Sequence, residues 1–349
     1  MASSKQHCLV TGGSGFVGKA LVSLLLENNW KVSILDSREP GYKGDFNFVK
    51  GDIRNYKDCI TATKFVDCVF HVAAVVPLGK NSQEIYDVNV KGTDNLLKSS
   101  EINKVKKFIF VSSSAVYGIP NSLPVNLETK MKPIEPYGKS KLAAENLCLT
   151  YLESNLLIQI VRPRTILGPG RLGIFGTFFE WFEKYGLILI IGKANSKYQF
   201  VHINDLCHGI MNASNLTIPT ILNLGNLEYG YLEDEFRALG TFAHRTLRIK
   251  HLPENFTRIT LLVLCKIKIL PFAPYQIKMF GKSFYFDSEL DWKKLNYTPT
   301  YSNFESLKEG YEFYVKENII SSKNSSSSIH SRGLDSRVLR VITKFMKGL

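Results

Sequence analysis

The stretch Thr11-Gly-Gly-Ser-Gly-Phe-Val-Gly18 joins a short apolar run, His7–Thr11, to an apolar-rich segment, Lys19–Asn29. The loop has the spacing G-x-x-G-x-x-G, carried by Gly12, Gly15 and Gly18. Glycine is needed there because a side chain would block both the tight turn and the close approach of a pyrophosphate. The helix that follows offers its N–H groups and the positive end of its dipole to that anion. The stretch predicts a strand, a phosphate-binding loop and a helix.

An acidic residue follows at the place where a dinucleotide site needs one. Asp36 ends the next strand-like run, Lys31–Asp36, and lies 18 residues after Gly18. A carboxylate there accepts hydrogen bonds from the adenosine ribose hydroxyls and repels a 2′-phosphate, which favours NAD. Arg38 keeps NADP open, because a guanidinium can pair with the additional phosphate.

The first half of the chain alternates strand-like and helix-like segments. Glu84–Ser100 has helical spacing, and six apolar runs are predicted strands: His7–Thr11, Lys31–Asp36, Phe46–Val49, Cys68–Ala74, Lys107–Ser112 and Ile158–Val161. Strands that are apolar throughout indicate a parallel sheet with both faces covered. We therefore expect an α/β fold of the Rossmann type, doubly wound, with its ligand at the carboxyl ends of the strands.

Three regions are expected along the chain. Residues 1–163 form the NAD-binding Rossmann core, and residues 164–318 form a small C-terminal substrate lobe interleaved with it, because glycines, prolines and aromatic residues become frequent there. Residues 319–349 are interpreted as a linker, rich in serine over Ser321–Ser328, followed by a basic amphipathic tail.

The chain is basic. Its 349 residues hold 44 Lys and Arg against 31 Asp and Glu, a net charge of +13, which suggests an anionic partner. No recognised nucleic-acid-binding motif accompanies this charge, so we expect no nucleic-acid partner. Residues 330–349 carry +4, from five basic residues and one acid. This tail is interpreted as a peripheral membrane contact, as a segment docked on the parent domain, or as a partly disordered end.

The six cysteines are scattered and include no C-x-x-C pair, which argues against a disulfide-stapled secreted domain and against a structural zinc site. We expect no metal. The N-terminus lacks the apolar core of a signal peptide, so a cytoplasmic protein is expected.

A candidate catalytic pair stands in Tyr137-Gly-Lys-Ser-Lys141. Tyr137 and Lys141 are four residues apart in a helix-like stretch and so project from one face. A phenol with a pKa near ~10 is a poor base at neutral pH, and a neighbouring ammonium stabilises its phenolate. By itself the pair also fits an exposed tyrosine and lysine on an ordinary helix. Upstream, Ser112-Ser-Ser114 places hydroxyls at a strand end, where one can bind a substrate hydroxyl or carbonyl.

These parts resemble one family from about Gln6 to Val315. TGGSGFVG, the strand-end Asp36, Gly51-Asp-Ile53, His71-Val-Ala-Ala74, Asn89-Val-Lys-Gly-Thr93, SSSAVYG and YGKSK occur in the order found in extended short-chain dehydrogenases/reductases. That group includes the NAD-dependent epimerase/dehydratase family.

The resemblance implies roles for individual residues. Tyr137 would be the catalytic base, Lys141 its partner, and Ser113 the catalytic hydroxyl. The implied cofactor-binding residues are Gly12, Ser14, Gly15, Phe16, Val17, Gly18, Asp36, Asp52, Ile53, Ala73, Asn89, Tyr137, Lys141 and Pro163. Family members are often homodimers through two helices of the Rossmann domain, so a homodimer is expected by the same resemblance.

The residues after Ser113 restrict the reaction. Sugar dehydratases of this family carry an Asp-Glu pair there, whereas this chain has Ser114-Ala115. The resemblance therefore argues against a 4,6-dehydratase. It leaves oxidation or reduction, or epimerisation through a transient ketone.

The substrate stays open between two classes. The leading interpretation is a nucleotide-linked sugar, with Ser114, Arg164, Arg171 and Lys197 as candidate substrate residues, although the segment Lys197–His202 lacks the arginine that clamps a diphosphate in nucleotide-sugar epimerases. The alternative is a sterol-like or other hydrophobic alcohol, because Ile259–Phe280 and Leu295–Pro299 are similar to the C-terminal part of 3β-hydroxysteroid dehydrogenases. His202 and Asp205 are expected to be structural. A non-catalytic NAD-binding scaffold is a third interpretation, and the set of Tyr137, Lys141 and Ser113 argues against it.

Overall fold

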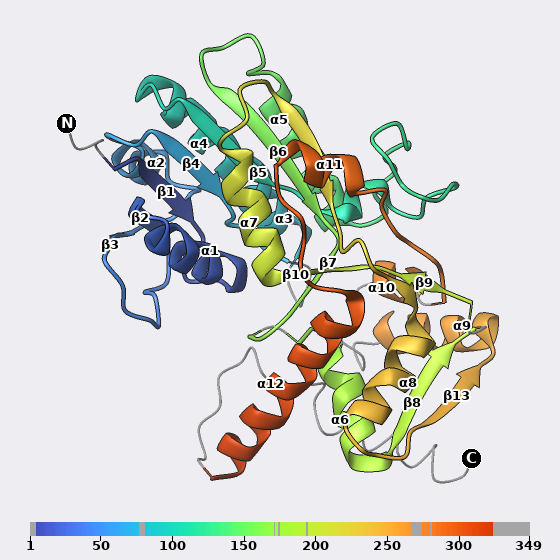
Figure 1. The fold of residues 1–349 in the computed structure, drawn as a ribbon. Helices are drawn as coiled ribbons and strands as arrows, with labels where there is room; N and C mark the ends of the chain where they lie inside the picture. The colour runs from blue at the N-terminus through green and yellow to red at the C-terminus, as the bar shows by residue number, and fades with distance from the viewer. Residues whose placement is uncertain are drawn as a thin grey trace. The chain divides into compact units, whose positions relative to one another are not determined.

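Seven parallel strands form the central sheet of this computed structural model (Figure 1), in the order β11-β6-β5-β4-β1-β2-β3. They are β1 (His7–Thr11), β2 (Lys31–Asp36), β3 (Phe46–Lys50), β4 (Cys68–His71), β5 (Lys107–Val111), β6 (Leu157–Pro163) and β11 (Thr220–Leu224). The structure describes residues 5–76, 81–170, 172–173, 175–192, 195–266, 274–279 and 281–323. The strand order reverses between β1 and β4, and a ligand of such a sheet binds beyond the carboxyl ends of these strands.

Alternate residues of each strand face opposite sides of the sheet. Leu9, Val69 and Phe108 face a core that helices α4 (Gly92–Ile102) and α5 (Pro136–Leu149) complete with Leu96 and Ala144. Helices α1 (Phe16–Glu27) and α7 (Ile203–Ala213) pack together over the other face (Figure 1). Burial on both faces is what the apolar strands of the first half predict.

The shorter elements lie between these helices and strands. They are α2 (Tyr56–Ala62), α3 (Ser82–Tyr86), the π-helical turn η1 (Asp87–Lys91), the 3₁₀ turn η2 (Ser114–Tyr117), β7 (Thr165–Leu167) and α11 (Glu289–Lys294). The expected single helix Glu84–Ser100 is therefore α3, η1 and α4 in succession. Likewise α5 begins at Pro136, so Tyr137 lies in its first turn.

The chain forms two compact units. The first contains Met1–Ile166, Ile203–Leu227 and Phe286–Thr300, and the second contains Leu167–His202, Glu228–Tyr285 and Tyr301–Leu349. The first unit takes in β11 as the seventh strand, a segment that the local sequence pattern does not mark as part of the sheet.

The second unit has a core of its own, built on aromatic side chains such as Phe179, Phe200, Phe236 and Tyr311. Its elements are α6 (Phe175–Tyr185), β8 (Leu187–Ile191), β9 (Lys197–Tyr198), β10 (Phe200–His202), β12 (Gly230–Tyr231), α8 (Leu232–Phe242), β13 (Arg248–Leu252), α9 (Glu254–Lys266), α10 (Pro274–Met279) and α12 (Asn303–Lys323). Strand β8 pairs in parallel with β13, and β9 pairs antiparallel with β12. Helix α12 runs past the expected start of the linker at residue 319, and the tail 330–349 lies outside the described residues.

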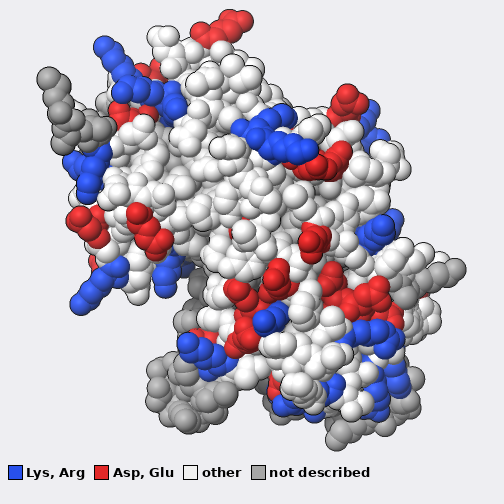
Figure 2. Space-filling model, viewed as in Figure 1, with Lys and Arg blue, Asp and Glu red and all other residues white. Residues whose placement is uncertain are grey.

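Surface charge is mixed. On the face drawn in Figure 2, groups of Lys and Arg lie among groups of Asp and Glu, and no continuous basic stripe crosses that face.

In the described part of the chain, no helix has both the length and the apolar content needed to cross a bilayer. Five cysteines, Cys8, Cys59, Cys68, Cys148 and Cys207, are buried and unpaired.

Candidate functional site

The glycine loop leaves no space for side chains. Gly12 has φ +73°, and a Cβ there would lie 2.7 Å from the Cα of Ala73. A Cβ on Gly18 would lie 2.1 Å from the carbonyl oxygen of Gly12. The loop is held in place, because the Gly12 N–H donates to Leu35 O at 3.0 Å. These contacts give a steric reason, within the protein itself, for glycine at positions 12 and 18.

The helix that follows the loop is open to an anion at its N-terminus. Its N-cap residue, Gly15, provides no side-chain cap, and the first turn holds no acidic residue. The dipole of α1 therefore meets no negative side chain from its own first turn. The Gly12–Ala73 contact, the close packing at Gly18 and this uncapped N-terminus together fit a pyrophosphate.

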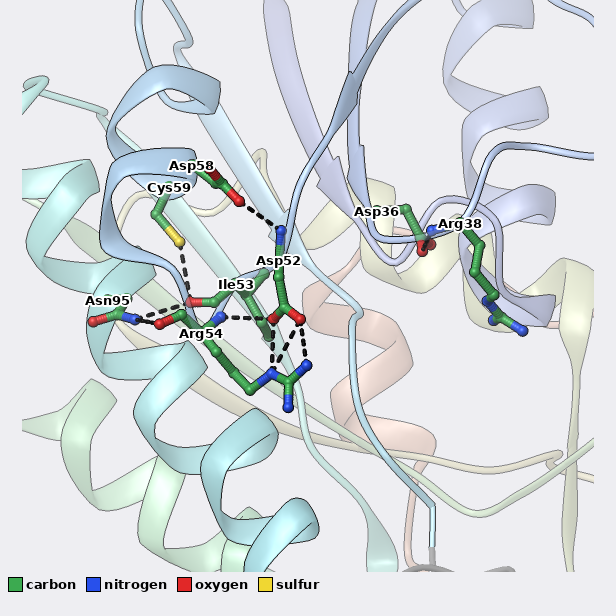
Figure 3. Close-up of polar contacts among 8 residues, drawn as sticks. All are labelled: Asp36, Arg38, Asp52, Ile53, Arg54, Asp58, Cys59 and Asn95. Atoms are coloured by element: carbon green, nitrogen blue, oxygen red, sulfur yellow. Dashed lines mark hydrogen bonds and ion pairs between the residues drawn. The ribbon is translucent and has the colours of Figure 1, made fainter.

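Asp36 is tied to the same loop. Its carboxylate accepts the N–H of Ser14 at 3.0 Å. It also accepts the N–H of Arg38 at 3.0 Å (Figure 3). The Arg38 side chain extends away from that carboxylate. Tyr42, which the sequence interpretation did not single out, donates from Oη to Gly13 O at 2.8 Å. Burial, followed by the charge of Asp36, raises the pKa of Tyr42 to about 12, so it remains a neutral donor.

A second polar cluster follows β3 (Figure 3). Arg54 donates from Nε and Nη2 to Asp52, with contacts of 2.5 to 3.0 Å, and these hydrogen bonds lower the pKa of Asp52. The Ile53 side chain is buried, and its carbonyl accepts Asn95 Nδ2 at 3.0 Å. Asp52 and Ile53, both predicted cofactor residues, thus sit in a segment fixed by ion pair and hydrogen bonds. Arg54 also belongs to this cluster, although none of the sequence motifs includes it.

A chain of hydrogen bonds links three elements behind the loop. His71, at the end of β4, lies 2.8 Å from Thr11 Oγ1 through Nδ1 and 2.8 Å from Thr93 Oγ1 through Nε2. Thr93 donates its own proton to Asn89 O at 2.7 Å, so Nε2 of His71 is assigned the hydrogen. Burial, reinforced by the charge of Lys141, lowers the pKa of His71 well below its ordinary value. Thr11 also accepts the N–H of Ala73 at 3.2 Å, which fixes that predicted cofactor residue.

Asn89 lies in the π-helical turn η1 and is buried. Its amide oxygen accepts the N–H of Val75 at 2.8 Å, and its amide nitrogen donates to Val75 O and to Ser140 Oγ, each at 3.0 Å. Asn89 thereby connects the loop after β4 with α5, the helix of Tyr137 and Lys141. Such π-turns are frequent at functional sites.

The candidate catalytic residues belong to two neighbouring segments. Ser113 follows β5, and its Oγ caps η2 by accepting the N–H of Ala115 at 3.2 Å. Helix α5 packs against η2, and a Cβ on Gly138 would lie 2.6 Å from Ala115 O. Gly138 therefore allows the first turn of α5, with Tyr137, to approach the turn that Ser113 begins.

Lys141, one turn after Tyr137 in α5, is deeply buried. Its Nζ donates to Val111 O at 2.8 Å and lies 4.8 Å from the centre of the Phe110 ring. Burial lowers the pKa of Lys141 to about 8, against the opposing effect of Glu145. The lysine is therefore charged at neutral pH and can stabilise a phenolate.

The candidate substrate residues are distributed over both units. In the first unit, Arg164 donates from Nη1 to Ser114 Oγ at 3.2 Å, and both side chains are buried. In the second unit, the Nζ of Lys197 lies 5.6 Å from the ring centre of Tyr231 and 5.9 Å from that of Tyr285. Arg171 lies outside the described residues.

Two residues near Lys197 in the sequence make contacts that are consistent with the expected structural role. His202 stacks on Tyr301 at 3.6 Å and lies 3.2 Å from Glu309 Oε2. Asp205 is fully buried and accepts Tyr297 Oη at 2.8 Å. Among the described residues, no group of His, Cys, Asp and Glu is arranged to hold a metal ion.

Residues 8–225 match the model of the NAD dependent epimerase/dehydratase family. The chain belongs to this family. The match runs from β1 to the end of β11 and so includes the glycine loop, Asp36, Ser113, Tyr137 and Lys141. Membership confirms the predicted class, an NAD-dependent enzyme of the extended short-chain dehydrogenase type, and the glycine loop fits its cofactor.

Three known proteins illustrate the likeness. The chain is 37% identical over 308 residues to the uncharacterized protein y4nG of Sinorhizobium fredii, covering 88% of this chain and 78% of that one. It is 27% identical over 328 residues to mouse sterol-4-alpha-carboxylate 3-dehydrogenase, decarboxylating, covering 87% and 90%. The crystal structure of UDP-glucuronic acid 4-epimerase from Bacillus cereus, in complex with UDP-glucuronic acid and NAD, matches with a TM-score of 0.73 and 25% identity, covering 90% of this chain and all of that one.

Proposed function

We propose that this enzyme transfers hydride at a carbinol/carbonyl carbon of a nucleotide-linked sugar, as an epimerase or as a net oxidoreductase. The observation that carries the proposal is the packing of α5 against η2, which brings the helix of Tyr137 and Lys141 to the turn that begins at Ser113. When bound, NAD supplies the hydride acceptor and donor.

The residues of the chain handle the proton. Tyr137 as phenolate takes the proton of the substrate hydroxyl, and Ser113 donates a hydrogen bond to the same oxygen. Lys141 remains an ammonium below about pH 8 and stabilises that phenolate. Gly12 and Gly18 with the N-terminus of α1 would hold the pyrophosphate, and Asp36 the adenosine ribose.

The nucleotide-sugar assignment is supported by Lys197. An ammonium beside the rings of Tyr231 and Tyr285 combines a positive charge for a phosphate with aromatic surface for a base. Ser114 and Arg164 offer a second polar pair in the first unit. The Bacillus cereus epimerase, which binds UDP-glucuronic acid, is consistent with the same class.

A second candidate is the dehydrogenation of a sterol-like or other hydrophobic alcohol. It is favoured by the sterol dehydrogenase relative and by apolar side chains exposed along α9, where Phe256 is 71% exposed, Ile259 64% and Val263 53%. Apolar side chains of this kind suit a hydrophobic substrate, because small-molecule sites are lined mainly by apolar and aromatic residues.

One assay separates the candidates. The purified enzyme is incubated with NAD and either UDP-glucose, UDP-glucuronic acid or a 3β-hydroxysterol, while NADH absorbance and product stereochemistry are followed. An epimerase inverts a UDP-sugar with no net NADH, whereas a dehydrogenase produces one NADH per product. Turnover of the sterol alone would refute the nucleotide-sugar proposal.

The oligomeric state and the cellular location of the enzyme are proposed as well. We propose a cytoplasmic homodimer whose basic tail, residues 330–349 with a charge of +4, contacts an anionic membrane surface. Sedimentation equilibrium measures the assembly. Vesicle sedimentation with and without the tail measures membrane contact, and equal binding of the two forms excludes that role.

A further inference from the structure

A buried ion pair joins α5, the helix of Tyr137 and Lys141, to strand β6. It has no part in the mechanism above. Glu145 of α5 accepts Arg162 Nη2 at 2.6 Å and Nε at 3.0 Å, and the side chains are only 1% and 3% exposed. Removing two charges from water is expensive, and apolar side chains of similar volume often stabilise a fold as well or better. Stability alone therefore gives no reason for charges at this place.

The pair connects the strand ends that carry the catalytic hydroxyls. The Ser112 hydroxyl donates to Glu145, and the Ser112 N–H donates to Val161 O at 2.7 Å. Ser112 directly precedes Ser113. Arg162 also donates from Nη1 to Tyr117 Oη at 2.7 Å, at the end of the turn that Ser113 begins.

Glu145 is also the acidic neighbour of Lys141. It lies one turn further along α5, and its charge raises the pKa of Lys141 against the effect of burial. Burial raises the pKa of Cys148 on the same helix well above its ordinary value, so this thiol stays neutral and adds no negative charge near Lys141. From β4, His71 faces Lys141 as a neutral ring.

The elements packed around Lys141 and α5 bring several other groups. Strand β5 presents the Val111 carbonyl and the Phe110 ring. The turn η1 carries Asp87 and Lys91, which pair with each other at 2.7 Å at the surface, and α3 carries the partly buried Glu84. Strand β6 carries the buried Arg162, whose positive charge opposes that of Glu145. Glu145 is the buried acid among these groups, and its charge favours the protonated form of Lys141.

We propose that Glu145 is a positioning residue: its buried carboxylate keeps Lys141 protonated and holds the Ser112–Ser113 strand end against α5. This proposal rests on the proposed function only for its effect on turnover. Residues four apart on a helix lie on one face, with Cβ atoms about 6 Å apart. Two charges about 6 Å apart at an effective dielectric constant of about 20 would change proton affinity by about a hundredfold, and this is an upper bound for Glu145 because its carboxylate is already paired with Arg162.

The test uses Glu145→Gln, which keeps the shape and an acceptor for Ser112 but removes the charge. A second variant, Glu145→Leu with Arg162→Met, removes both charges and restores packing, so it keeps the test valid if the single variant folds poorly. The matched control is Asp94→Asn, which breaks an exposed pair with Lys98, also four residues apart, at 2.6 Å on α4.

Titration of ¹³C-labelled lysine by NMR, with the Lys141 signal assigned by its loss in Lys141→Arg, measures the proton directly and needs no substrate. We expect the Lys141 midpoint of about 8 to fall by about one to two pH units in Glu145→Gln, to fall by less in the doubly apolar variant because the charge of Arg162 is removed as well, and to stay unchanged in the control. With UDP-glucose and NAD, kcat at pH 7 is expected to fall about twofold to tenfold in Glu145→Gln, because a midpoint between about 7 and about 6 leaves roughly half to a tenth of Lys141 protonated, with the NAD dissociation constant within twofold.

An unchanged Lys141 midpoint in the variants would overturn the proposal, as would recovery of wild-type kcat in the doubly apolar variant. The second result would mean that the pair serves packing alone. If the wild-type enzyme turns over neither UDP-glucose nor UDP-glucuronic acid but oxidises the sterol, the substrate assignment fails, and the Lys141 titration still decides the role of Glu145.

Discussion

The requirement for glycine in the phosphate-binding loop can be tested by replacing three glycines with alanine, one at a time. The three differ in how much space surrounds an added Cβ. A Cβ on Gly18 would lie 2.1 Å from Gly12 O, where ordinary contact begins at 3.4 Å, so the loop and α1 must separate by about 1.3 Å. The loop has little freedom to do so, because Gly12 is bonded through its N–H to Leu35 and through its carbonyl to Gly15.

The magnitude follows from overpacking, which destabilises a fold by about 1–3 kcal/mol. For a unit of roughly 200 residues this lowers the melting temperature by about 2–12 °C. The N–H groups at the start of α1 would also no longer point at the pyrophosphate. NAD is therefore expected to bind at least ten times more weakly, which is a loss of about 1.4 kcal/mol in binding free energy.

Gly15 and Gly41 serve as comparisons, because an added Cβ has more space at each of them than at Gly18. A Cβ on Gly15 would lie 3.1 Å from Gly12 O, so Gly15→Ala needs a movement of a few tenths of an ångström and should weaken NAD binding less. Gly41 has no atom within 4 Å of an added Cβ, and Gly41→Ala is the matched control. It should leave binding unchanged and stabilise the fold by up to about 1 kcal/mol.

Isothermal titration with NAD and thermal melts of the unliganded variants provide both quantities. The expected order of effect is Gly18→Ala, then Gly15→Ala, then Gly41→Ala. A Gly18→Ala variant that binds NAD and melts like the Gly41→Ala variant would refute the reasoning.

Four further substitutions address the candidate site. Tyr137→Phe removes the proposed base, and turnover is expected to fall by about 10²- to 10⁴-fold with NAD affinity unchanged; full activity would exclude the mechanism. Because burial holds the pKa of Lys141 at about 8, below its ordinary 10.5, the unfolded chain binds more protons between these values, so the wild type gains stability as pH rises from 8 to 10.5. Lys141→Met should lack that gain and resist urea better at pH 7 by up to about 3 kcal/mol, and equal pH dependence of the two proteins would contradict the assignment. Asp36→Asn should shift the ratio of NADP to NAD affinity at least tenfold toward NADP, measured by parallel titrations, because the charge that repels a 2′-phosphate is gone; Arg38→Ala, which leaves Asp36 in place, should shift it the other way.

Local sequence signals predicted the parts of the site that lie close together in the chain. The loop Gly12–Gly18 and Asp36 are separated by one helix, and Tyr137 and Lys141 by one helical turn, so spacing alone indicates their proximity. The apolar strands predicted a parallel sheet for the same reason, since burial on both faces leaves its mark in each strand separately.

Contacts between distant segments were not predictable in this way. The contact of Gly12 with Ala73 and the pairing of Glu145 with Arg162 depend on which strands become neighbours. Strand β11 is short and apolar, and only its pairing with β6 makes it part of the sheet. An arginine inside the apolar run of β6 is the one local signal that a buried acid lies nearby.

The hydrogen-bond chain through His71 has a consequence for how the enzyme responds to acidity. Each donor in the series Thr11, His71, Thr93 already has its acceptor, and the buried imidazole takes up no proton near neutrality. The charge of His71, which links the cofactor loop to η1, therefore stays constant over the pH range in which a histidine ordinarily titrates. An inflection of the rate near pH 8 should therefore be traced first to Lys141, with His71 left out of the assignment.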